Sequence, residues 1–327
     1  MKIILVCLIG ILSFILTYVI RIITLKYKIV DIPNDRSSHK LPTPRGGGLA
    51  IVISWYMGIS ILFYFKLIEL GLFLALLSGS IIAVVSLIDD IIKVKAIIRL
   101  FIHFIAVIIA FHFLGELRPL IMPNLEINYY IFIYPLAIVG MVWFVNLFNF
   151  MDGLDGFAST EAIILAIVMF AYSGNIINLL LIASIVGFLY WNWPKAKIFL
   201  GDVGSTQLGF ILVVLGIYFH NTFKFSILNW IMLSSPFWFD ATYTLFRRWR
   251  NNEKLSHAHK KHVYQRIVQA GFSHQKVLFS LIIINGIVVV FILLYREFKF
   301  LQIPLFAITL ILFFFITKLV DQKVPFK

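Results

Sequence analysis

Apolar segments recur along the whole chain, and short polar stretches separate them. A helix of about 20 consecutive apolar residues is long enough to span the hydrocarbon core of a bilayer. Eleven segments approach this length, so the pattern predicts eleven membrane-spanning helices. They cover residues 3–23, 47–66, 70–88, 97–114, 129–148, 156–173, 176–193, 204–221, 226–245, 276–295 and 301–319.

The predicted fold class is an all-α, polytopic membrane helix bundle, with residues 1–327 forming a single integral-membrane domain. Of the 327 residues, 61% are hydrophobic and only 13% are charged, whereas a soluble protein keeps about a quarter of its residues charged. The first apolar segment lacks a small-residue cleavage site, so we interpret it as a retained span. The single cysteine, Cys7, excludes an intramolecular disulfide.

Lysine and arginine are distributed unevenly between the two sets of loops. All but six of the 28 lie in one set, and by the positive-inside rule that set is cytoplasmic. This orientation places the N-terminus outside and the C-terminus inside. The net charge of +13 is held in loops and not in a basic stripe with interleaved aromatics. We therefore expect membrane lipid and anionic substrates as partners, and no nucleic acid.

Four polar clusters lie at the predicted cytoplasmic edge of the apolar segments. Charge is costly at the rim of a bilayer, so several carboxylates on one side indicate a functional site. The clusters are Asp89-Asp90, the segment 146–156, the segment 199–205 and the segment 257–262.

Asp89 and Asp90 end an apolar segment. The C-terminal end of a helix carries partial negative charge, so two acids are unfavourably placed there. A solvated helix end, with Lys93 and Lys95 as partners, is one interpretation. A general base or a cation ligand is the other, and the unfavourable placement favours it.

Asn149, Asp152 and Asp155 are spaced by three, and two glycines interrupt the segment, which predicts a turn or a broken helix. Asp-Gly turn chemistry explains the Asp-Gly pairs. It does not explain Asn146, three residues before Asn149. The amides and exposed backbone N–H groups of this segment are suited to a nucleotide.

The two remaining clusters each have two interpretations. Asp202 is either an N-cap residue or a ligand of a hard cation. The basic segment 245–275 is either a solvated loop that sets topology or a clasp for phosphate. Its histidine spacing does not fit a structural zinc site. Isolated His103 and Glu161 are interpreted as ordinary intramembrane polar residues.

Carboxylates and basic groups on one aqueous face suit phosphoryl transfer. Mg²⁺ is held by one or two carboxylates together with substrate phosphates, and it neutralises charge on the transferring group. A base is needed only if the attacking group arrives protonated. A transporter is the alternative, but transporters place such acids near the midplane within paired repeats. A lipid scaffold without catalysis is a third reading.

The clusters, in this order, resemble the polyprenyl-phosphate N-acetylhexosamine-1-phosphate transferases, a family that includes the phospho-MurNAc-pentapeptide transferase. The resemblance extends over nearly the whole chain. The motifs that carry it are Asp31-x-Pro33 to Gly47-Gly48, Asp89-Asp90, Asn149-x-x-Asp152-Gly-x-Asp155-Gly156, Gly201-Asp202-x-Gly204-Ser205, and Pro236-x-x-x-Asp240 with Arg247-Arg248.

The resemblance implies that undecaprenyl phosphate attacks the β-phosphate of a UDP-N-acetyl sugar, giving a lipid-diphosphate sugar and UMP. It implies Mg²⁺, with Mn²⁺ as a substitute, and a multi-pass protein of the bacterial inner membrane. A homodimer is left open. The site would lie on the cytoplasmic face, formed by loops 24–46, 89–96, 149–156, 194–205 and 246–275.

The resemblance also implies roles for individual residues. Asp89 and Asp90 would activate the nucleophile, and Asp202 with Asp90 would bind the metal. The nucleotide sugar would be bound by Lys40, Asn149, Asp152 and Asp155. The pyrophosphate would be bound by His259, His262 and Arg266.

One departure from the family pattern bears on the substrate. Many members carry His-x-His-His and then Arg before a Gly-Phe pair. This chain retains only His262 and Arg266 of that run, although His259 and Lys260 lie just upstream and are expected to take over pyrophosphate contacts. The departure argues against the phospho-MurNAc-pentapeptide enzyme, which remains the alternative within the family. It favours a transferase that initiates O-antigen, capsule or related cell-wall glycans.

Overall fold

The computed structural model describes residues 2–33, 41–122, 125–127, 130–255, 257 and 259–326. Most of them are helical and very few are in strands, which confirms the predicted all-α class. The strands of this part of the chain form two short antiparallel pairs: β1 (Val30–Asp31) with β2 (Thr43–Pro44), and β3 (Leu120–Met122) with β4 (Leu125–Ile127). The helices are α1 (Lys2–Lys26), α2 (Gly48–Tyr64), α3 (Leu70–Leu77), α4 (Gly79–Ile91), α5 (Ala96–Leu114), α6 (Tyr130–Phe150), α7 (Phe157–Ser173), α8 (Ile176–Asn192), α9 (Gly201–Asn221), α10 (Ile227–Leu233), α11 (Ser235–Arg250), α12 (Val263–Gln269), α13 (His274–Glu297), the 3₁₀ turn η1 (Lys299–Leu301) and α14 (Gln302–Lys323).

Seven helical segments of the described chain are long and apolar enough to cross a membrane, and α2, α7 and α8 are shorter apolar helices. Every predicted span overlaps one helix or a pair of consecutive helices. The protein is therefore a multi-pass membrane protein. The count of eleven spans and the orientation of the termini stay predictions.

Two predicted spans are each divided into two helices. The segment 70–88 forms α3 and α4, which meet at Ser78, and 226–245 forms α10 and α11, which meet at Ser234. Ser78 donates a hydrogen bond to the carbonyl of Ala106 in α5, at 3.0 Å. Helix α4 continues to Ile91, so the two adjacent acids lie in its last turn.

The polar segment 246–275 is not a loop throughout, and the prediction of a loop is wrong at two places. Helix α11 extends to Arg250, and residues Val263–Gln269 form α12. The short helix α12 is too brief to be stable alone. It begins where the side chain of Asp240, from α11, accepts hydrogen bonds from its first N–H groups.

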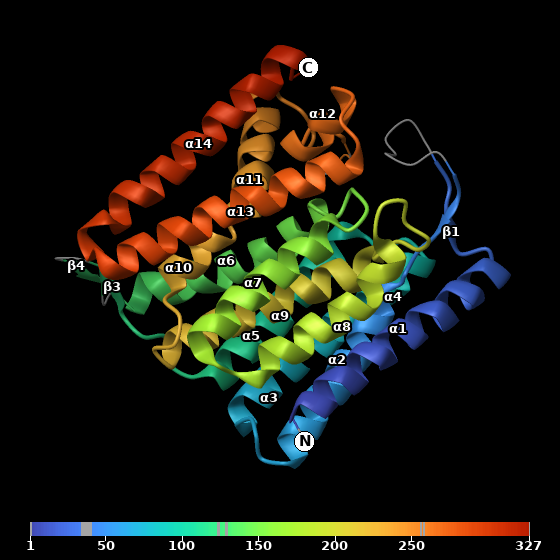
Figure 1. Cartoon of the computed structure of the whole chain (residues 1–327), viewed down its shortest axis with the longest axis horizontal. Helices are drawn as coiled ribbons and strands as arrows, with labels where there is room; N and C mark the ends of the chain where they lie inside the picture. Colours follow the sequence, from blue (N-terminus) through green and yellow to red (C-terminus); the bar gives the residue numbers. More distant parts are fainter. Residues whose placement is uncertain are drawn as a thin grey trace.

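Helix α9 lies at the centre of the bundle, in contact with α2, α4, α6 and α7 (Figure 1). Its apolar stretch is 94% buried, against 17% for α1 at the edge. Two glycines allow the closest approach, because a Cβ atom on Gly48 would lie 2.2 Å from the Cα atom of Gly204. The backbones of α2 and α9 therefore touch at the point where both helices begin.

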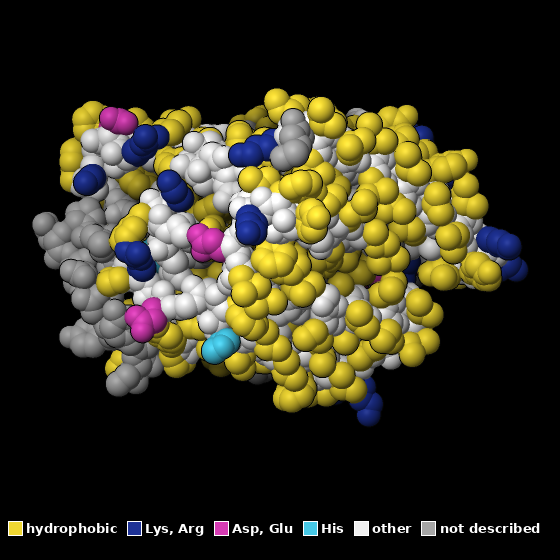
Figure 2. All heavy atoms as spheres, turned by 90° about the horizontal axis from the view of Figure 1, so that it is seen from below, with side chains coloured by type: hydrophobic (Ala, Val, Ile, Leu, Met, Phe, Trp, Pro, Cys, Tyr) yellow, Lys and Arg dark blue, Asp and Glu magenta, His cyan; other side chains and the backbone are white. Residues whose placement is uncertain are grey.

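Helices α11, α12, α13 and α14 pack together on one side of the bundle (Figure 1). Hydrophobic side chains cover most of the face seen in Figure 2, and charged side chains gather toward its ends. Helices α1, α13 and α14 expose many large apolar residues. A continuous apolar surface of this kind is suited to contact with lipid chains.

Candidate active site

The glycine-rich segment before α2 pairs with the segment before α9. The N–H groups of Gly47 and Gly48 donate to the carbonyls of Phe199 and Leu200 at 2.9 and 2.8 Å, and Phe199 N–H donates to Pro44 at 2.8 Å. This pairing fixes the start of α9, which carries Asp202, against the first loop.

The side chain of Asp90, a residue of α4, caps the N-terminus of α9. Its carboxylate accepts hydrogen bonds from the N–H groups of Asp202 and Val203, at 3.1 and 3.2 Å, and the residue is only 5% exposed. The interpretation of Asp202 as an N-cap is wrong, because the cap position is Leu200 and the accepting oxygens belong to Asp90. A carboxylate at this position is also favoured by the helix dipole.

Arg45 explains how two acids are tolerated at the C-terminal end of α4. Its guanidinium donates to the backbone carbonyl of Asp90 at 2.5 Å through Nη2 and at 3.1 Å through Nε, and to that of Asp89 at 3.3 Å. A cation on the last carbonyls compensates the negative end of the helix dipole. The Asp90 carboxylate lies 3.7 Å from the same guanidinium.

Asp89 and Asp202 form a pair of carboxyl groups in contact with one another. Arg99, in the first turn of α5, places one nitrogen, Nη1, 2.5 Å from Asp89 Oδ2 and 2.8 Å from Asp202 Oδ2. The other Asp89 oxygen accepts from Val94 N–H at 2.7 Å. The pair is therefore open to solvent mainly through Asp202, whose side chain is 33% exposed.

Asp152 lies in the turn between α6 and α7 and is half-buried. Burial, together with the negative charges of Asp202, Asp90 and Asp155, raises the pKa of the Asp152 carboxyl well above its usual range. No hydrogen bond or ion pair engages this carboxyl within the described part of the chain. The site thus concentrates more negative charge than its own side chains neutralise, and such a site favours a bound cation.

The same turn is tied to its neighbours on both sides. Asp155 accepts from Ala196 N–H at 3.2 Å and lies 3.3 Å from Nδ1 of His274, the first residue of α13. Asn149, in the last turn of α6, accepts from Asp152 N–H through its carbonyl at 3.2 Å. Gly156, with φ of +70°, permits the sharp turn into α7.

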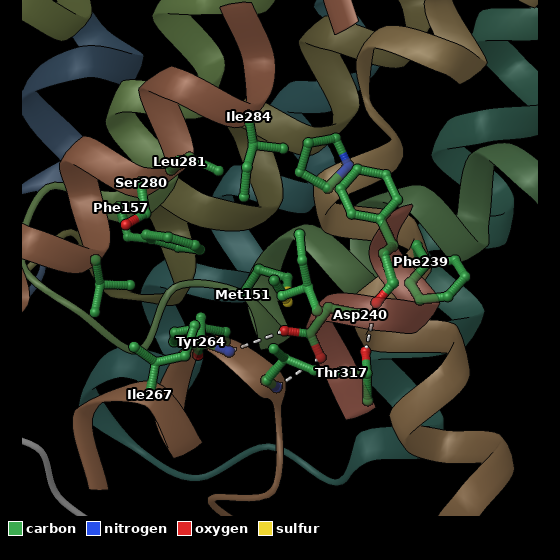
Figure 3. A pocket seen from close by; sticks show the side chains of 15 residues that line it. Met151, Phe157, Phe239, Asp240, Tyr264, Ile267, Ser280, Leu281, Ile284 and Thr317 are labelled. Atoms are coloured by element: carbon green, nitrogen blue, oxygen red, sulfur yellow. Dashed lines mark hydrogen bonds between the residues drawn. The ribbon is translucent and has the colours of Figure 1, made fainter. Parts of the chain in front are cut away.

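The basic segment reaches this turn through α12. Asp240 accepts from the N–H groups of Val263 and Tyr264 at 2.9 and 3.2 Å, as Figure 3 shows beside a small apolar cavity. The Tyr264 ring stacks on Phe157 at 4.8 Å between centroids, and its hydroxyl donates to the Phe150 carbonyl at 3.0 Å. Helix α12 therefore contacts both ends of the turn that carries Asp152 and Asp155.

The rings of His259 and His262 lie next to each other, with centroids 4.8 Å apart and planes tilted by 41°. His262 is 3% exposed, and its Nδ1 lies 3.4 Å from Asp240. Burial, together with the neighbouring His262 and Arg248, lowers the pKa of His259 to about 3. Its Nδ1 accepts from Lys261 N–H at 3.2 Å. His259 is therefore neutral at physiological pH, with its hydrogen on Nε2, where it is available to a phosphate oxygen.

We expect His259 to make the protein sensitive to acid. Its folded pKa of about 3 lies below the unfolded value of 6.5, so the unfolded state takes up the proton first, and stability is lost as pH falls from about 6.5 towards 3. Thermal melting at pH 7.5 and pH 5 should show a smaller decrease for His259→Gln than for the wild type. An equal decrease in both proteins would show that His259 titrates normally.

Arg266 faces away from the acids. It is 2% exposed, its Nη2 lies 2.7 Å from Asp321 Oδ1, and it donates to the carbonyl of Val324. Arg247 of α11 shares the same Asp321 oxygen at 3.0 Å and stacks on Phe326. The C-terminal segment thus fastens α12 to α11.

Removing the shared carboxylate is expected to destabilise this corner of the bundle. Asp321→Ala leaves buried Arg266 without its anionic partner, at an expected cost of about 3 kcal/mol. Thermal unfolding in detergent would measure the loss. Arg250→Ala, an exposed residue of α11, is the matched control and should melt close to the wild type.

The structure brings five predicted residues together at one end of the bundle: Asp89, Asp90, Asp152, Asp155 and Asp202. Lys40 lies outside the described residues. In the described chain no group of three or more His, Cys, Asp or Glu side chains is arranged to hold a metal. The pair Asp89–Asp202 nevertheless offers two hard oxygen donors, and Mg²⁺ needs only one or two when phosphates complete its shell.

Sequence reasoning gave no specific role to four residues of the site: Arg45, Arg99, Tyr264 and His274. Arg45 and Arg99 were visible only as topology-setting charges. Arg99 lies one short loop after the paired acids, and this proximity was the available signal. Tyr264 and His274 carried no signal, because their contacts join segments more than 100 residues apart in sequence.

Fold and site together define a multi-pass membrane protein that gathers carboxylates where the ends of α4 and α6 lie close to the start of α9. Residues 72–220 match the glycosyl transferase family 4. A probable undecaprenyl-phosphate N-acetylglucosaminyl 1-phosphate transferase of Bacillus subtilis (strain 168) is 30% identical, over 94% of this chain and 90% of the relative. A decaprenyl-phosphate N-acetylglucosaminephosphotransferase of Mycobacterium leprae (strain TN) is 26% identical, over 86% of this chain and 81% of the relative. A phospho-N-acetylmuramoyl-pentapeptide-transferase of Kosmotoga olearia is 32% identical, over 54% of this chain and 60% of the relative.

The chain belongs to this family, the polyprenyl-phosphate N-acetylhexosamine-1-phosphate transferases of glycosyl transferase family 4. It is accordingly a transferase.

Proposed function

We propose that the protein transfers N-acetylglucosamine 1-phosphate from UDP-N-acetylglucosamine to undecaprenyl phosphate. An oxygen of the lipid phosphate forms a bond to the β-phosphorus of the nucleotide sugar. The bond from that phosphorus to the bridging oxygen breaks, and UMP leaves with the oxygen and its electron pair. The product is a lipid-diphosphate sugar, which would initiate a cell-surface glycan such as O-antigen, capsule or cell-wall polymer.

The contact between Asp89 and Asp202, where α4 meets α9, is the observation that carries the proposal. Two carboxylates held against each other, with Asp152 close by, form a site that favours a cation and a phosphate-bearing ligand together. Mg²⁺, or Mn²⁺ in its place, would be held by Asp202 with Asp89 and would neutralise charge on the diphosphate. Asp90, with its carboxylate bonded to α9, would position Asp202.

Asp89 is also proposed as the base when the lipid phosphate arrives as a monoanion. The proton on that phosphate would pass to the carboxylate as the new bond forms. Asp89 Oδ1 accepts a hydrogen bond from Val94 N–H, and Oδ2 lies 2.5 Å from Arg99 Nη1.

The nucleotide sugar is proposed to lie over the turn between α6 and α7. Asn149, Asp152 and Asp155 line this turn, and Lys40 is assigned to the same ligand. His259 offers an Nε2–H to a phosphate oxygen. His262 and Arg266, both buried against aspartates, would support the pyrophosphate contacts by holding α12.

The acceptor lipid has a place beside the same helices. An apolar cavity of about 470 Å³ lies between α6, α9, α10 and α11. Phe144 and Leu147, which line it, precede Asn149 on α6 by about one and a half turns and about half a turn. A polyprenyl chain in this cavity would leave its phosphate near the acid end, which we place on the cytoplasmic face of the bacterial inner membrane, as the distribution of Lys and Arg favours.

Isotope exchange tests the reaction directly. Purified protein should incorporate radiolabelled UMP into UDP-N-acetylglucosamine only when a polyprenyl-diphosphate sugar and Mg²⁺ are both present. A panel of UDP-N-acetyl sugars and UDP-MurNAc-pentapeptide would identify the donor. Exchange that needs no lipid, or its absence with every donor, would contradict the proposal. Ion-dependent solute uptake by vesicles would then favour the transporter.

A further inference from the structure

Arg99 occupies the place between the two carboxylates where a divalent cation would be expected. A single nitrogen, Nη1, is shared by Asp89 Oδ2 and Asp202 Oδ2, at 2.5 and 2.8 Å. Two like charges in contact repel each other unless a cation lies between them. The guanidinium therefore supplies the charge that stabilises the pair.

The same position cannot hold both cations. A metal ion bound to these two oxygens would displace the Nη1 hydrogens and would repel the guanidinium through its own double charge. The Arg99 side chain can move, because it is 31% exposed and belongs to a residue in the first turn of α5. A diphosphate at the site would offer it a bidentate anionic partner instead.

The neighbouring Arg45 has a different role. Its recorded hydrogen bonds go to backbone carbonyls of Asp89 and Asp90, which are fixed by the helix and remain in place whether or not a metal is bound. Of these two arginines, only Arg99 has hydrogen bonds that end on the carboxylate pair. The two therefore differ in what ligand binding would do to them.

We propose that Arg99 is a resident counter-ion that holds Asp89 and Asp202 together before substrate binds, and that it transfers to the diphosphate when a divalent cation takes its place. The inference rests on the proposed function, since it assumes a divalent cation and a nucleotide diphosphate at this site. The consequence is that binding of the metal depends on the nucleotide sugar. A metal ion alone competes with Arg99 for the two carboxylates, whereas a metal ion that binds with the nucleotide sugar does not. The nucleotide sugar should thus tighten metal binding, and the coupling is reciprocal.

Mn²⁺ titration followed by electron paramagnetic resonance measures this competition without any turnover. In the absence of nucleotide, Arg99→Gln should bind Mn²⁺ about ten-fold more tightly than the wild type or better, because the competing charge is gone. Lys93→Gln is the matched control, since it removes the same charge from an exposed side chain in the loop just before α5. Lys93→Gln should bind Mn²⁺ as the wild type does, and so should Arg99→Lys, which keeps the charge.

With saturating UDP-N-acetylglucosamine the advantage of Arg99→Gln should disappear or reverse, because in the wild type Arg99 now contacts the diphosphate. Should Arg99→Gln melt early without metal, Mn²⁺ must restore its melting temperature to that of the wild type. Equal Mn²⁺ affinities with and without Arg99, an advantage that persists with nucleotide, or no restoration would each overturn the inference.

Failure of the inference is distinguishable from failure of the proposed function. If the wild type binds Mn²⁺, Asp202→Asn does not, and Arg99→Gln behaves as the wild type, then the metal site stands and only the role of Arg99 is wrong. If the wild type binds no Mn²⁺ even with UDP-N-acetylglucosamine, the assignment of a metal-dependent transferase fails.

Discussion

Asp202→Asn should lose transfer activity by about a thousand-fold or more while the protein remains folded. A metal contact to a transferring phosphoryl group is worth several kcal/mol, and each 1.4 kcal/mol of lost stabilisation is about a factor of ten in rate. Asparagine has the same shape and removes a like charge from contact with Asp89. The melting temperature should therefore stay equal or rise slightly.

UMP release and thermal unfolding, measured on the same preparation, separate these two effects. Glu116→Gln removes an exposed acid outside the site and should keep wild-type activity. Near-normal turnover of Asp202→Asn would remove Asp202 from the metal site. Loss of folding would mean instead that its ion pair with Arg99 is structural.

Asp90→Ala is expected to produce the opposite signature, with a clear loss of stability. The substitution leaves two N–H groups, those of Asp202 and Val203, without their acceptor at a buried helix start. The expected cost is about 2 to 4 kcal/mol. Activity should fall as well, because the first turn of α9 carries Asp202. Thermal unfolding in detergent measures the stability term.

Asp90→Asn distinguishes positioning from metal binding. An asparagine keeps one acceptor oxygen for α9, so we expect it to retain roughly a tenth of the activity or more. If Asp90 were a metal ligand, Asp90→Asn would be as inactive as Asp202→Asn. Ser86→Ala is the control for the α4–α9 contact, since it loses one neutral hydrogen bond to Thr206, at 2.9 Å, and should cost only about 1 kcal/mol.

The different roles of Asp89 and Asp90 cannot be seen in the sequence. Asp89 and Asp90 are adjacent residues of one motif, and sequence reasoning assigned both of them to catalysis. Successive residues of a helix point about 100° apart. One carboxylate therefore faces the start of α9, whereas the other faces Arg99 and the open edge.

The placement of the apolar helical segments could be read from the sequence, because a bilayer demands a minimum apolar length. The positions at which the helices break could not be read from the sequence. Ser78 and Ser234 are weak signals, and the break at Ser78 is held by a hydrogen bond to Ala106 of a neighbouring helix. Helix α12 was missed for a similar reason, since its first N–H groups are bonded to Asp240, on another helix.

By itself, the sequence determined the all-α membrane class, the family and the gathering of carboxylates at one edge. The class and the gathering follow from segment length and from the high cost of placing charge near lipid, and the family follows from the motifs; all of these are local properties of the chain. The tertiary structure alone decided which carboxylate caps a helix, which pair shares Arg99, and that Arg266 faces the C-terminus. Those roles depend on side-chain directions and on contacts between distant segments, which no local pattern encodes.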